Sequence, residues 1–305
     1  MRFSGHETFS IREGWLHKGL KLLLHEPHLL TDEYSADWLG VGQNMAKSIR
    51  YWLTTTGLAD SAPDRRASDG PALRPTDLAH LIWDNDPYFS ETGTWWALHV
   101  NLVNNTEQAT SWAWFFNSFA ASRFEKAVCV DGLRRYLQLS TSRALSGRTI
   151  ERDLACLLRS YARPIPLEQE DPEEALDCPF VELGLLSYYR ASGYYQFIQS
   201  IKDIPPHLFG FCLSTAFEQV RTGAGNADVS LSSAIREAGG PGRCFVLGGE
   251  SLFDLVLRLE EATRGKDIQV AGLAGERVIR VPRRSPLDWM SRYYRTVAQR
   301  SRHVA

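Results

Sequence analysis

In the N-terminal part of the chain, apolar residues recur every three or four positions, which is the period of an α-helix. One such stripe predicts an amphipathic helix over residues 12–26, ended by Pro27. Residues 31–60 then predict a short helix, a tight turn at Gly40 and a longer helix over 43–56. This order of elements is typical of a helix-turn-helix.

Two short strands are expected after the longer helix, at residues 58–60 and 72–74. The polar loop between them carries Arg65 and Arg66, which can reach phosphate or the minor groove. A strand, a basic loop and a second strand behind a recognition helix are typical of a winged helix-turn-helix. The next helix is expected to be capped by Thr76.

Further along, residues 86–120 are rich in aromatic side chains, which favours a helical core or interdomain joint over a surface for stacking bases. Residues 146–161 predict a second recognition-type helix, with Ser146 or Thr149 as its N-cap. Near the C-terminus, residues 243–247 are expected to form a strand and residues 269–281 a hairpin.

These elements predict a mainly α protein with small β wings, built from tandem winged helix-turn-helix units. We expect an N-terminal winged unit with an aromatic-rich helical extension over residues 1–120. A second helix-turn-helix-like unit and an acidic linker would follow over 121–182, and a C-terminal winged-helix-like unit with a basic tail over 183–305. A length of 305 residues accommodates three small units.

Charge is arranged in blocks, although the net charge of the chain is only -2. Residues 121–163 hold nine basic and four acidic side chains, whereas residues 164–182 hold seven acidic side chains and no basic one. Over the last thirty residues, eight arginines stand against two acidic residues. The net charge alone does not indicate a nucleic-acid partner. Two basic segments separated by an acidic one do support such a partner.

Several function classes are excluded by missing motifs. The chain has no phosphate-binding GxxxxGK[ST] loop, no GxGxxG after a strand, no GxSxG and no HExxH. Its five cysteines show no zinc-binding spacing and are expected to be buried free thiols in a reducing compartment. Without an apolar signal core or a membrane-length apolar run, the protein is expected in the cytoplasm and away from membranes.

A dispersed set of polar residues could still support phosphodiester hydrolysis. His6 and Glu7 lie in the segment FSGHETF, shortly before Glu13, and Asp84 and Asp86 lie two positions apart. A histidine beside carboxylates can act as a base, and Glu7, Asp84 and Asp86 could hold Mg²⁺ or Mn²⁺. Two structural alternatives stay open: the first segment could dock the N-terminus through a hydrogen-bonded His6, and the two aspartates could cap a turn.

The expected DNA contacts lie on the two recognition-type helices and on the wing. Asparagine and glutamine suit adenine, whereas lysine and arginine suit guanine or phosphate. The candidates are Gln43, Asn44, Lys47, Ser48, Arg50, Tyr51, Arg65, Arg66, Arg148 and Arg152.

The segments FSGHETFSIREGWLHKGL, WLGVGQNMAKSIRYWLTTTGL and DPYFSETGTWWALH resemble a bacterial family first catalogued as a domain of unknown function. This is the SspB-like family of DNA phosphorothioation and phage-defence systems. The resemblance covers nearly the whole chain and is strongest over residues 1–165. It implies a DNA nickase that opens one strand for sulfur insertion and acts with a cysteine desulfurase, an ATPase and a reductase-like sulfurtransferase.

The resemblance carries no catalytic residues over to this chain. Gln43 stands where the family pattern predicts lysine, which removes one phosphate contact. The leading hypothesis is a metal-dependent nickase acting on double-stranded DNA. A non-catalytic recognition or scaffold subunit, which the residues alone favour, and a winged-helix transcription regulator are the alternatives, and a homodimer stays open.

Overall fold

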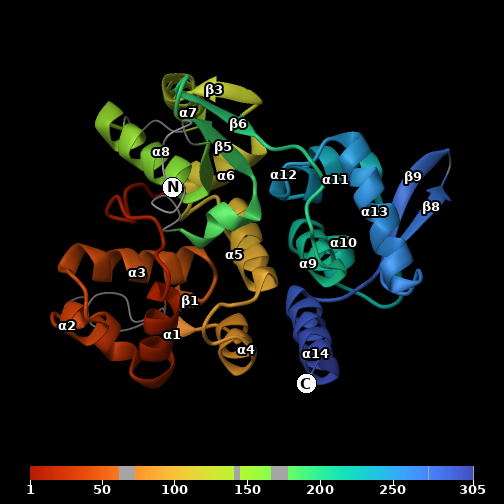
Figure 1. Ribbon diagram of the computed structural model, residues 1–305, viewed down its shortest axis with the longest axis horizontal. Coiled ribbons are helices and arrows are strands. Elements are labelled where there is room, and N and C mark those ends of the chain that lie inside the picture. The colour runs from red at the N-terminus through yellow and green to blue at the C-terminus, as the bar shows by residue number, and fades with distance from the viewer. Residues whose placement is uncertain (62–72, 141–144, 166–177, 274, 305) are drawn as a thin grey trace.

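A computed structural model of the chain describes residues 1–61, 73–140, 145–165, 178–273 and 275–304. Two lobes lie side by side in Figure 1, the first extending to residue 197 and the second beginning at residue 206. The fold is mainly α with small sheets, as the sequence predicts. Within the described ranges, no helix combines the length and the apolar character needed to cross a membrane.

The N-terminal part of the first lobe contains the predicted short helix, longer helix and two-stranded hairpin. The apolar stripe of the first helix is buried through Trp15, Leu16, Leu20 and Leu23, which explains why this segment is helical. The predicted cap of the fourth helix is confirmed, because Thr76 Oγ1 accepts a hydrogen bond from the backbone N–H of Ala79 at 3.2 Å. The elements are α1 (Trp15–His25), η1 (Pro27–Leu30), α2 (Ser35–Leu39), α3 (Gln43–Thr55), β1 (Ala59–Ser61), β2 (Leu73–Pro75) and α4 (Asp77–Asn85).

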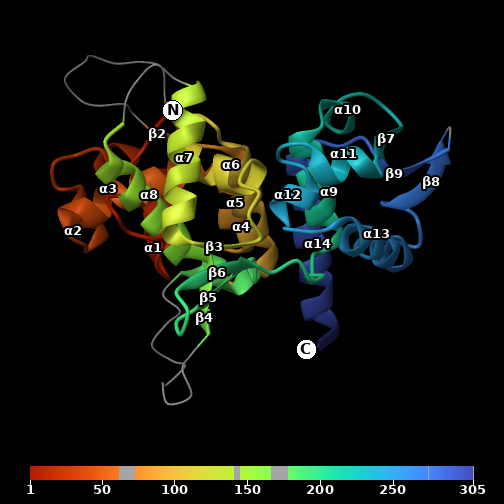
Figure 2. The same cartoon turned by 90° about the horizontal axis from the view of Figure 1, so that it is seen from above.

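The rest of the first lobe packs helices against a four-stranded sheet, which lies below α7 in Figure 2. The strand order is β3-β6-β5-β4; β4 pairs with β5 in parallel, and the other neighbouring strands are antiparallel. The elements are α5 (Thr92–Asn104), α6 (Thr110–Asn117), β3 (Arg123–Glu125), α7 (Lys126–Ser140), α8 (Gly147–Tyr161), β4 (Ala162–Ile165), η3 (Pro179–Leu183), β5 (Leu186–Tyr189) and β6 (Tyr194–Phe197).

This sheet changes the expected domain boundaries. Strands from residues 123–165 pair with strands from 186–197, so the boundary expected after residue 182 falls inside one sheet. Most of the expected acidic linker lies outside the described residues. The C-terminal end of this expected linker belongs to the hydrophobic core, because Phe180 is fully buried and its ring stacks on Tyr161 with a centroid separation of 5.2 Å.

The second lobe contains a three-stranded sheet of order β7-β9-β8 with helices around it. The predicted C-terminal hairpin is confirmed as β8 and β9. The prediction of a strand at residues 243–247 is wrong, because helix α12 ends at Cys244 and Phe245 follows it without strand pairing. The elements are α9 (Pro206–Ala216), α10 (Glu218–Arg221), β7 (Asn226–Ser230), α11 (Leu231–Arg236), α12 (Pro241–Cys244), α13 (Gly249–Thr263), β8 (Gln269–Leu273), β9 (Glu276–Pro282) and α14 (Pro286–Val304).

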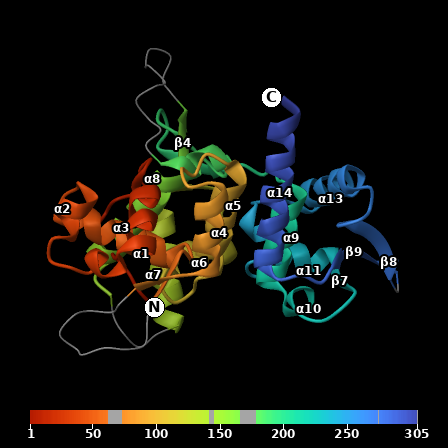
Figure 3. The same ribbon diagram turned by 90° about the horizontal axis from the view of Figure 1, so that it is seen from below.

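The two lobes share a buried joint. Helix α5 packs against α6 and η3 in the first lobe and against α9 in the second. The long helix α14 runs beside α9 and also reaches α4, and its C-terminal end extends beyond the lobes in Figure 3. Close approach of α9 and α14 depends on Gly210, where a Cβ atom would lie 2.5 Å from Cδ2 of Trp289.

Candidate nucleic-acid interface

The N-terminal segment FSGHETF forms a tight turn against helix α3. Ser4, Glu7 and Thr8 have φ angles of 56°, 49° and 71°, a left-handed conformation that is uncommon for residues other than glycine. Gly5 lets the segment approach Tyr51, because a Cβ atom there would lie 2.4 Å from Cδ2 of the tyrosine ring. A backbone held this tightly needs strong anchoring elsewhere.

The anchor is a buried hydrogen-bond network centred on Asp153 of helix α8. Its carboxylate accepts hydrogen bonds from the backbone N–H of Ser4 at 2.6 Å, His6 Nε2 at 2.9 Å and Ser111 Oγ at 2.5 Å. His6 Nδ1 accepts from the backbone N–H of Thr8, so the ring proton sits on Nε2 and points at the aspartate.

His6 is therefore a structural residue in this arrangement. It is fully buried, and both of its ring nitrogens are occupied by partners within the protein. The alternative that the turn docks the N-terminus through a hydrogen-bonded His6 matches this geometry. The candidate role of His6 as a base would require the ring to leave the network.

The same segment covers one face of α3 and buries two residues expected to contact DNA. Ser48 is fully buried and its hydroxyl donates to the carbonyl of Phe9 at 3.5 Å, and Trp52 Nε1 donates to the same carbonyl at 3.1 Å. Tyr51 is 3% exposed and lies beneath the N-terminal turn. The expectation that Ser48 and Tyr51 face outward is wrong, because residues 3–9 cover that side of the helix.

The exposed face of α3 keeps the remaining polar candidates. Gln43, Asn44 and Lys47 are exposed in its first half, and Gln43 Nε2 donates to the carbonyl of Glu33 at 3.4 Å. The backbone N–H groups at a helix start carry partial positive charge, which favours contact with phosphate. These three side chains therefore form a compact, solvent-facing polar surface.

Beside this surface lies a cavity of about 400 Å³ between the N-terminal segment, α3 and the β1–β2 hairpin. Among the described residues that line it, Arg2, Lys47 and Arg50 are basic and Glu7 supplies the one carboxylate. Arg50 is half-buried and donates to the carbonyl of Leu30 at 2.6 Å, and burial lowers its pKa from the usual value. Three cations facing one anion make the cavity suited to an anionic ligand such as a phosphate group.

A second basic surface lies on helix α8. Arg148 and Arg152 are exposed, while Asp153 faces inward from the same helix. The predicted cap of this helix is confirmed, because Ser146 Oγ accepts from the backbone N–H of Thr149 at 3.1 Å. Arg65 and Arg66, expected on the wing, lie outside the described residues.

Asp86, one of the candidate metal ligands, holds the turn that leads from α4 into α5. Its carboxylate accepts from the backbone N–H groups of Ser90 at 2.8 Å and Glu91 at 3.1 Å and from Thr94 Oγ1 at 2.7 Å, and the residue is 5% exposed. Asp84 is exposed at the end of α4. The geometry of Asp86 matches the capping alternative.

The other carboxylate candidates are not gathered into one site. Glu13 is exposed and lines a separate cavity of about 270 Å³, whereas Glu7 lines the basic cavity. Over the described part of the chain, no group of three or more His, Cys, Asp or Glu side chains could hold a metal ion. Glu7, Asp84 and Asp86 are therefore not part of such a group in the described residues, and their role as metal ligands stays a prediction.

Two important residues were missed by sequence reasoning. Arg2 carries no signal in the sequence pattern, although it lines the basic cavity and its guanidinium lies 5.5 Å from the centroid of the Tyr51 ring. Asp153 did carry a signal, because it lies between the inward-facing residues Ile150 and Leu154 of an amphipathic helix. A carboxylate on an apolar helix face must find buried partners, so it marks a hidden polar network.

The comparisons with known proteins agree with this fold. The chain is similar to two solved structures described as "Magnesium ion-bound SspB crystal structure" and "SspB crystal structure". Each is 28% identical, with 95% of this chain and 85% of the other chain covered and a TM-score of 0.79. No protein with a curated description matches significantly. The model of the family "Protein of unknown function (DUF4007)" matches residues 3–294, and the chain belongs to this family.

Proposed function

We propose that this protein is the DNA-binding component of a DNA phosphorothioate modification system and that it nicks one strand for sulfur insertion. The observation that carries the proposal is the shared fold with SspB over 95% of the chain. The exposed polar half of α3 and the adjacent basic cavity supply a physical means of binding DNA.

The proposed DNA-reading unit is a winged helix made of α2, α3 and the β1–β2 hairpin. In this arrangement α3 enters the major groove. Arg65 and Arg66, which lie outside the described residues, remain proposed contacts to the DNA backbone. Gln43 and Asn44 are suited to adenine and Lys47 to guanine or phosphate. Arg2 and Arg50 would hold a phosphate in the cavity beside the helix.

The α13–β8–β9 segment repeats the order of helix and hairpin and is the proposed second winged unit. Arg148 and Arg152 on α8 would contact the DNA backbone separately.

The metal requirement of the proposed nickase rests on similarity alone. One of the two similar SspB structures contains magnesium, and divalent cations commonly stabilise the charge that develops in phosphodiester cleavage. The described residues do not fit a three-carboxylate site, so we derive no catalytic step through Mg²⁺ or Mn²⁺. Glu7 is the carboxylate best placed to act near a bound phosphate, since it lines the basic cavity.

Plasmid nicking tests the catalytic part. The purified protein should convert supercoiled plasmid to open circles with Mg²⁺ or Mn²⁺ and stop when EDTA is added. Glu7→Ala should abolish nicking, whereas Glu261→Ala, at an exposed glutamate of α13 in the second lobe, is the matched control. Intact plasmid at high protein concentration with every metal would refute the nickase.

Fluorescence anisotropy with a labelled duplex tests the DNA-binding part. Lys47→Ala should weaken binding and reduce the slope of log affinity against log salt by about one, because one phosphate contact is lost. Lys266→Ala, an exposed lysine of the second lobe, is the control of equal charge. Equal affinities for the two variants would contradict the placement of DNA on α3.

A non-catalytic recognition or scaffold subunit of the same system is the second candidate. The observation in its favour is that His6 and Asp86, two of the candidate catalytic residues, are occupied by internal hydrogen bonds. It predicts salt-sensitive duplex binding without cleavage under any metal. In both cases the proposed partners are the cysteine desulfurase, the ATPase and the reductase-like sulfurtransferase of the system. Co-purification with these partners would support the nickase or the recognition subunit, whereas a transcription regulator would not co-purify with them.

A further inference from the structure

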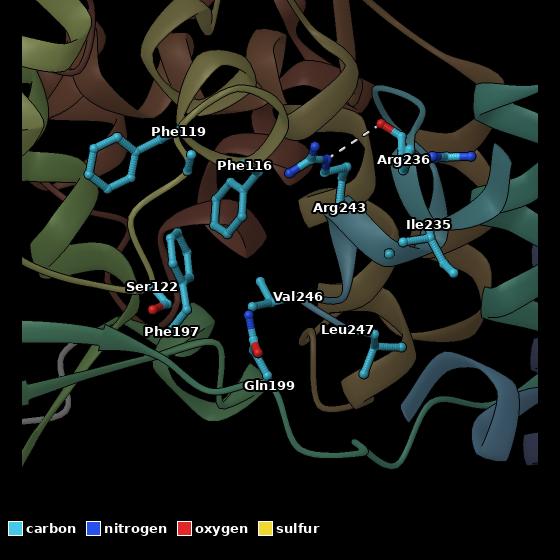
Figure 4. Close-up of a pocket in the computed structure, with 12 residues that line it drawn as sticks. Phe116, Phe119, Ser122, Phe197, Gln199, Ile235, Arg236, Arg243, Val246 and Leu247 are labelled. Carbon is cyan, nitrogen blue, oxygen red and sulfur yellow. Dashed lines mark hydrogen bonds between the residues drawn. The ribbon is translucent and has the colours of Figure 1, made fainter. Parts of the chain in front are cut away.

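A cavity of about 250 Å³ lies between the two lobes, away from α3. Its walls come from the end of α6 and the end of β6 in the first lobe and from α11, α12 and the residues after α12 in the second. Figure 4 shows that side chains of the two lobes face each other across this space. A ligand bound here would touch both lobes at once.

The wall formed by the first lobe is aromatic. Phe116, Phe119 and Phe197 line it, and the ring centroids of Phe116 and Phe197 lie 6.3 Å apart. Phe119 and Phe197 are only partly buried, so their ring surfaces remain available. Exposed aromatic rings in a concave site are suited to a flat, unsaturated ligand.

The wall formed by the second lobe is basic. Arg236 is exposed, and the half-buried Arg243 donates through Nε to the carbonyl of Arg236 at 3.5 Å, which directs its guanidinium toward Phe116 in Figure 4. Among the described residues that line the cavity, none is acidic. The Arg243 guanidinium, which faces the aromatic rings across the cavity, matches a ligand that joins a flat ring to an anion.

The lining is held in a defined conformation. Val246 has a φ of 52°, a left-handed value that is costly for a β-branched residue, and its neighbour Leu247 donates its backbone N–H to Gly242 at 2.9 Å. Lys202, in the segment between the lobes, donates to the carbonyls of Ser200 at 2.9 Å and Val246 at 3.4 Å. This lysine therefore ties the interlobe segment to the cavity wall.

We propose that the interlobe cavity binds one unpaired nucleotide of single-stranded DNA, with the base against the accessible ring of Phe197 and the phosphate on Arg243. The inference rests on the proposed DNA-binding function, which it deepens by giving the opened strand its own site. Pockets for drug-sized ligands begin at roughly 300 Å³, so this cavity suits one base rather than a dinucleotide. Enzymes that do chemistry on a base hold a single nucleotide outside the stack in a pocket, which shows that a protein site can accommodate one unpaired nucleotide.

The test compares two labelled ten-nucleotide single strands at low salt, one with normal bases and one with abasic sugars throughout. Both carry the same phosphate charge, so their difference in affinity reports base contact. The wild-type protein should bind the base-containing strand roughly tenfold more tightly, as expected for stacking of one base. Equal affinity for the two strands would overturn the inference.

Two substitutions locate the effect without disturbing the core. Gln199→Glu is isosteric at an exposed position of the lining and brings a negative charge into the cavity; Arg243→Gln removes the guanidinium that would hold the phosphate. Each should weaken binding of the base-containing strand several-fold, whereas Arg258→Ala, an exposed arginine of α13 outside the cavity, should not. Wild-type affinity in both cavity variants would refute the assignment.

Duplex binding separates this inference from the proposed function. If Lys47→Ala weakens duplex binding while both cavity variants bind single strands normally, only the cavity assignment fails. If Lys47→Ala has no effect on the duplex while the cavity variants lose the single strand, the placement of duplex on α3 fails and the cavity assignment stands.

Discussion

Acidification is expected to destabilise the protein through His99, a buried histidine at the joint between the lobes. The residue is fully buried on α5, and its ring nitrogens lie 2.8 Å from the hydroxyl of Tyr161 and 2.8 Å from the carbonyl of Cys244. Because a carbonyl only accepts, Nε2 carries the proton and Nδ1 accepts from Tyr161. The ring is therefore held in its neutral form.

The size of the effect follows from the pKa of His99. Burial, only partly offset by the hydrogen bond to Cys244, lowers this pKa from 6.5 to about 4. The unfolded chain takes up a proton between these two values while the folded chain does not, so the stabilisation is complete above pH 6.5 and is lost as the pH falls toward 4. Each pKa unit corresponds to about 1.4 kcal/mol, which gives a loss of about 3 kcal/mol.

Urea unfolding at pH 7.5 and pH 4.5 measures this loss in the wild type and in His99→Gln. Glutamine can still donate to the carbonyl of Cys244 but does not titrate, so the variant should lose about 2.5 kcal/mol less stability between the two pH values, since pH 4.5 lies above the folded pKa. Carboxylates titrate in both proteins and cancel in the difference. His80→Gln, at an exposed histidine of α4, serves as the control and should lose as much stability on acidification as the wild type. The same acid-induced loss in His99→Gln and in the wild type would refute the reasoning.

Three further predictions concern the buried packing and the helix caps. Asp153→Ala should lower the free energy of unfolding by roughly 3 kcal/mol or more, because three buried donors lose their acceptor; an unchanged urea midpoint would contradict the network. Gly210→Ala should cost roughly 1–3 kcal/mol by forcing α9 away from Trp289, and a wild-type melting temperature would show that the contact yields freely. Ser146→Ala should cost about 1 kcal/mol through loss of the α8 cap, whereas Ser146→Asp should restore the melting temperature.

Local structure was predictable wherever a repeated apolar spacing or a capping residue was present. The helix expected over residues 43–56 is α3, and the caps Thr76 and Ser146 hold their expected helices. The strand expected at 243–247 failed because its apolar residues are buried, and a short apolar run does not distinguish a strand from a buried helical turn. The domain boundary after residue 182 failed because strand pairing across long sequence distances leaves no local signal.

The candidate site was only partly predictable for a related reason. The spacing along α3 correctly identified Gln43, Asn44 and Lys47 as solvent-facing, since helical phase alone decides which side avoids the core. It could not show that residues 3–9 cover Ser48 and Tyr51, because that covering depends on a segment outside the helix.

The sequence by itself determined the helices, their caps, the basic and acidic segments and the family resemblance, because each depends on residues close together in the chain or on a recognisable motif. Only the tertiary structure decided which polar groups are free to act. His6 and Asp153 are 147 positions apart, yet they meet in a buried hydrogen bond. A buried polar group must find a partner wherever the fold supplies one, so the chemical role of such a residue is settled by packing rather than by its neighbours in the sequence.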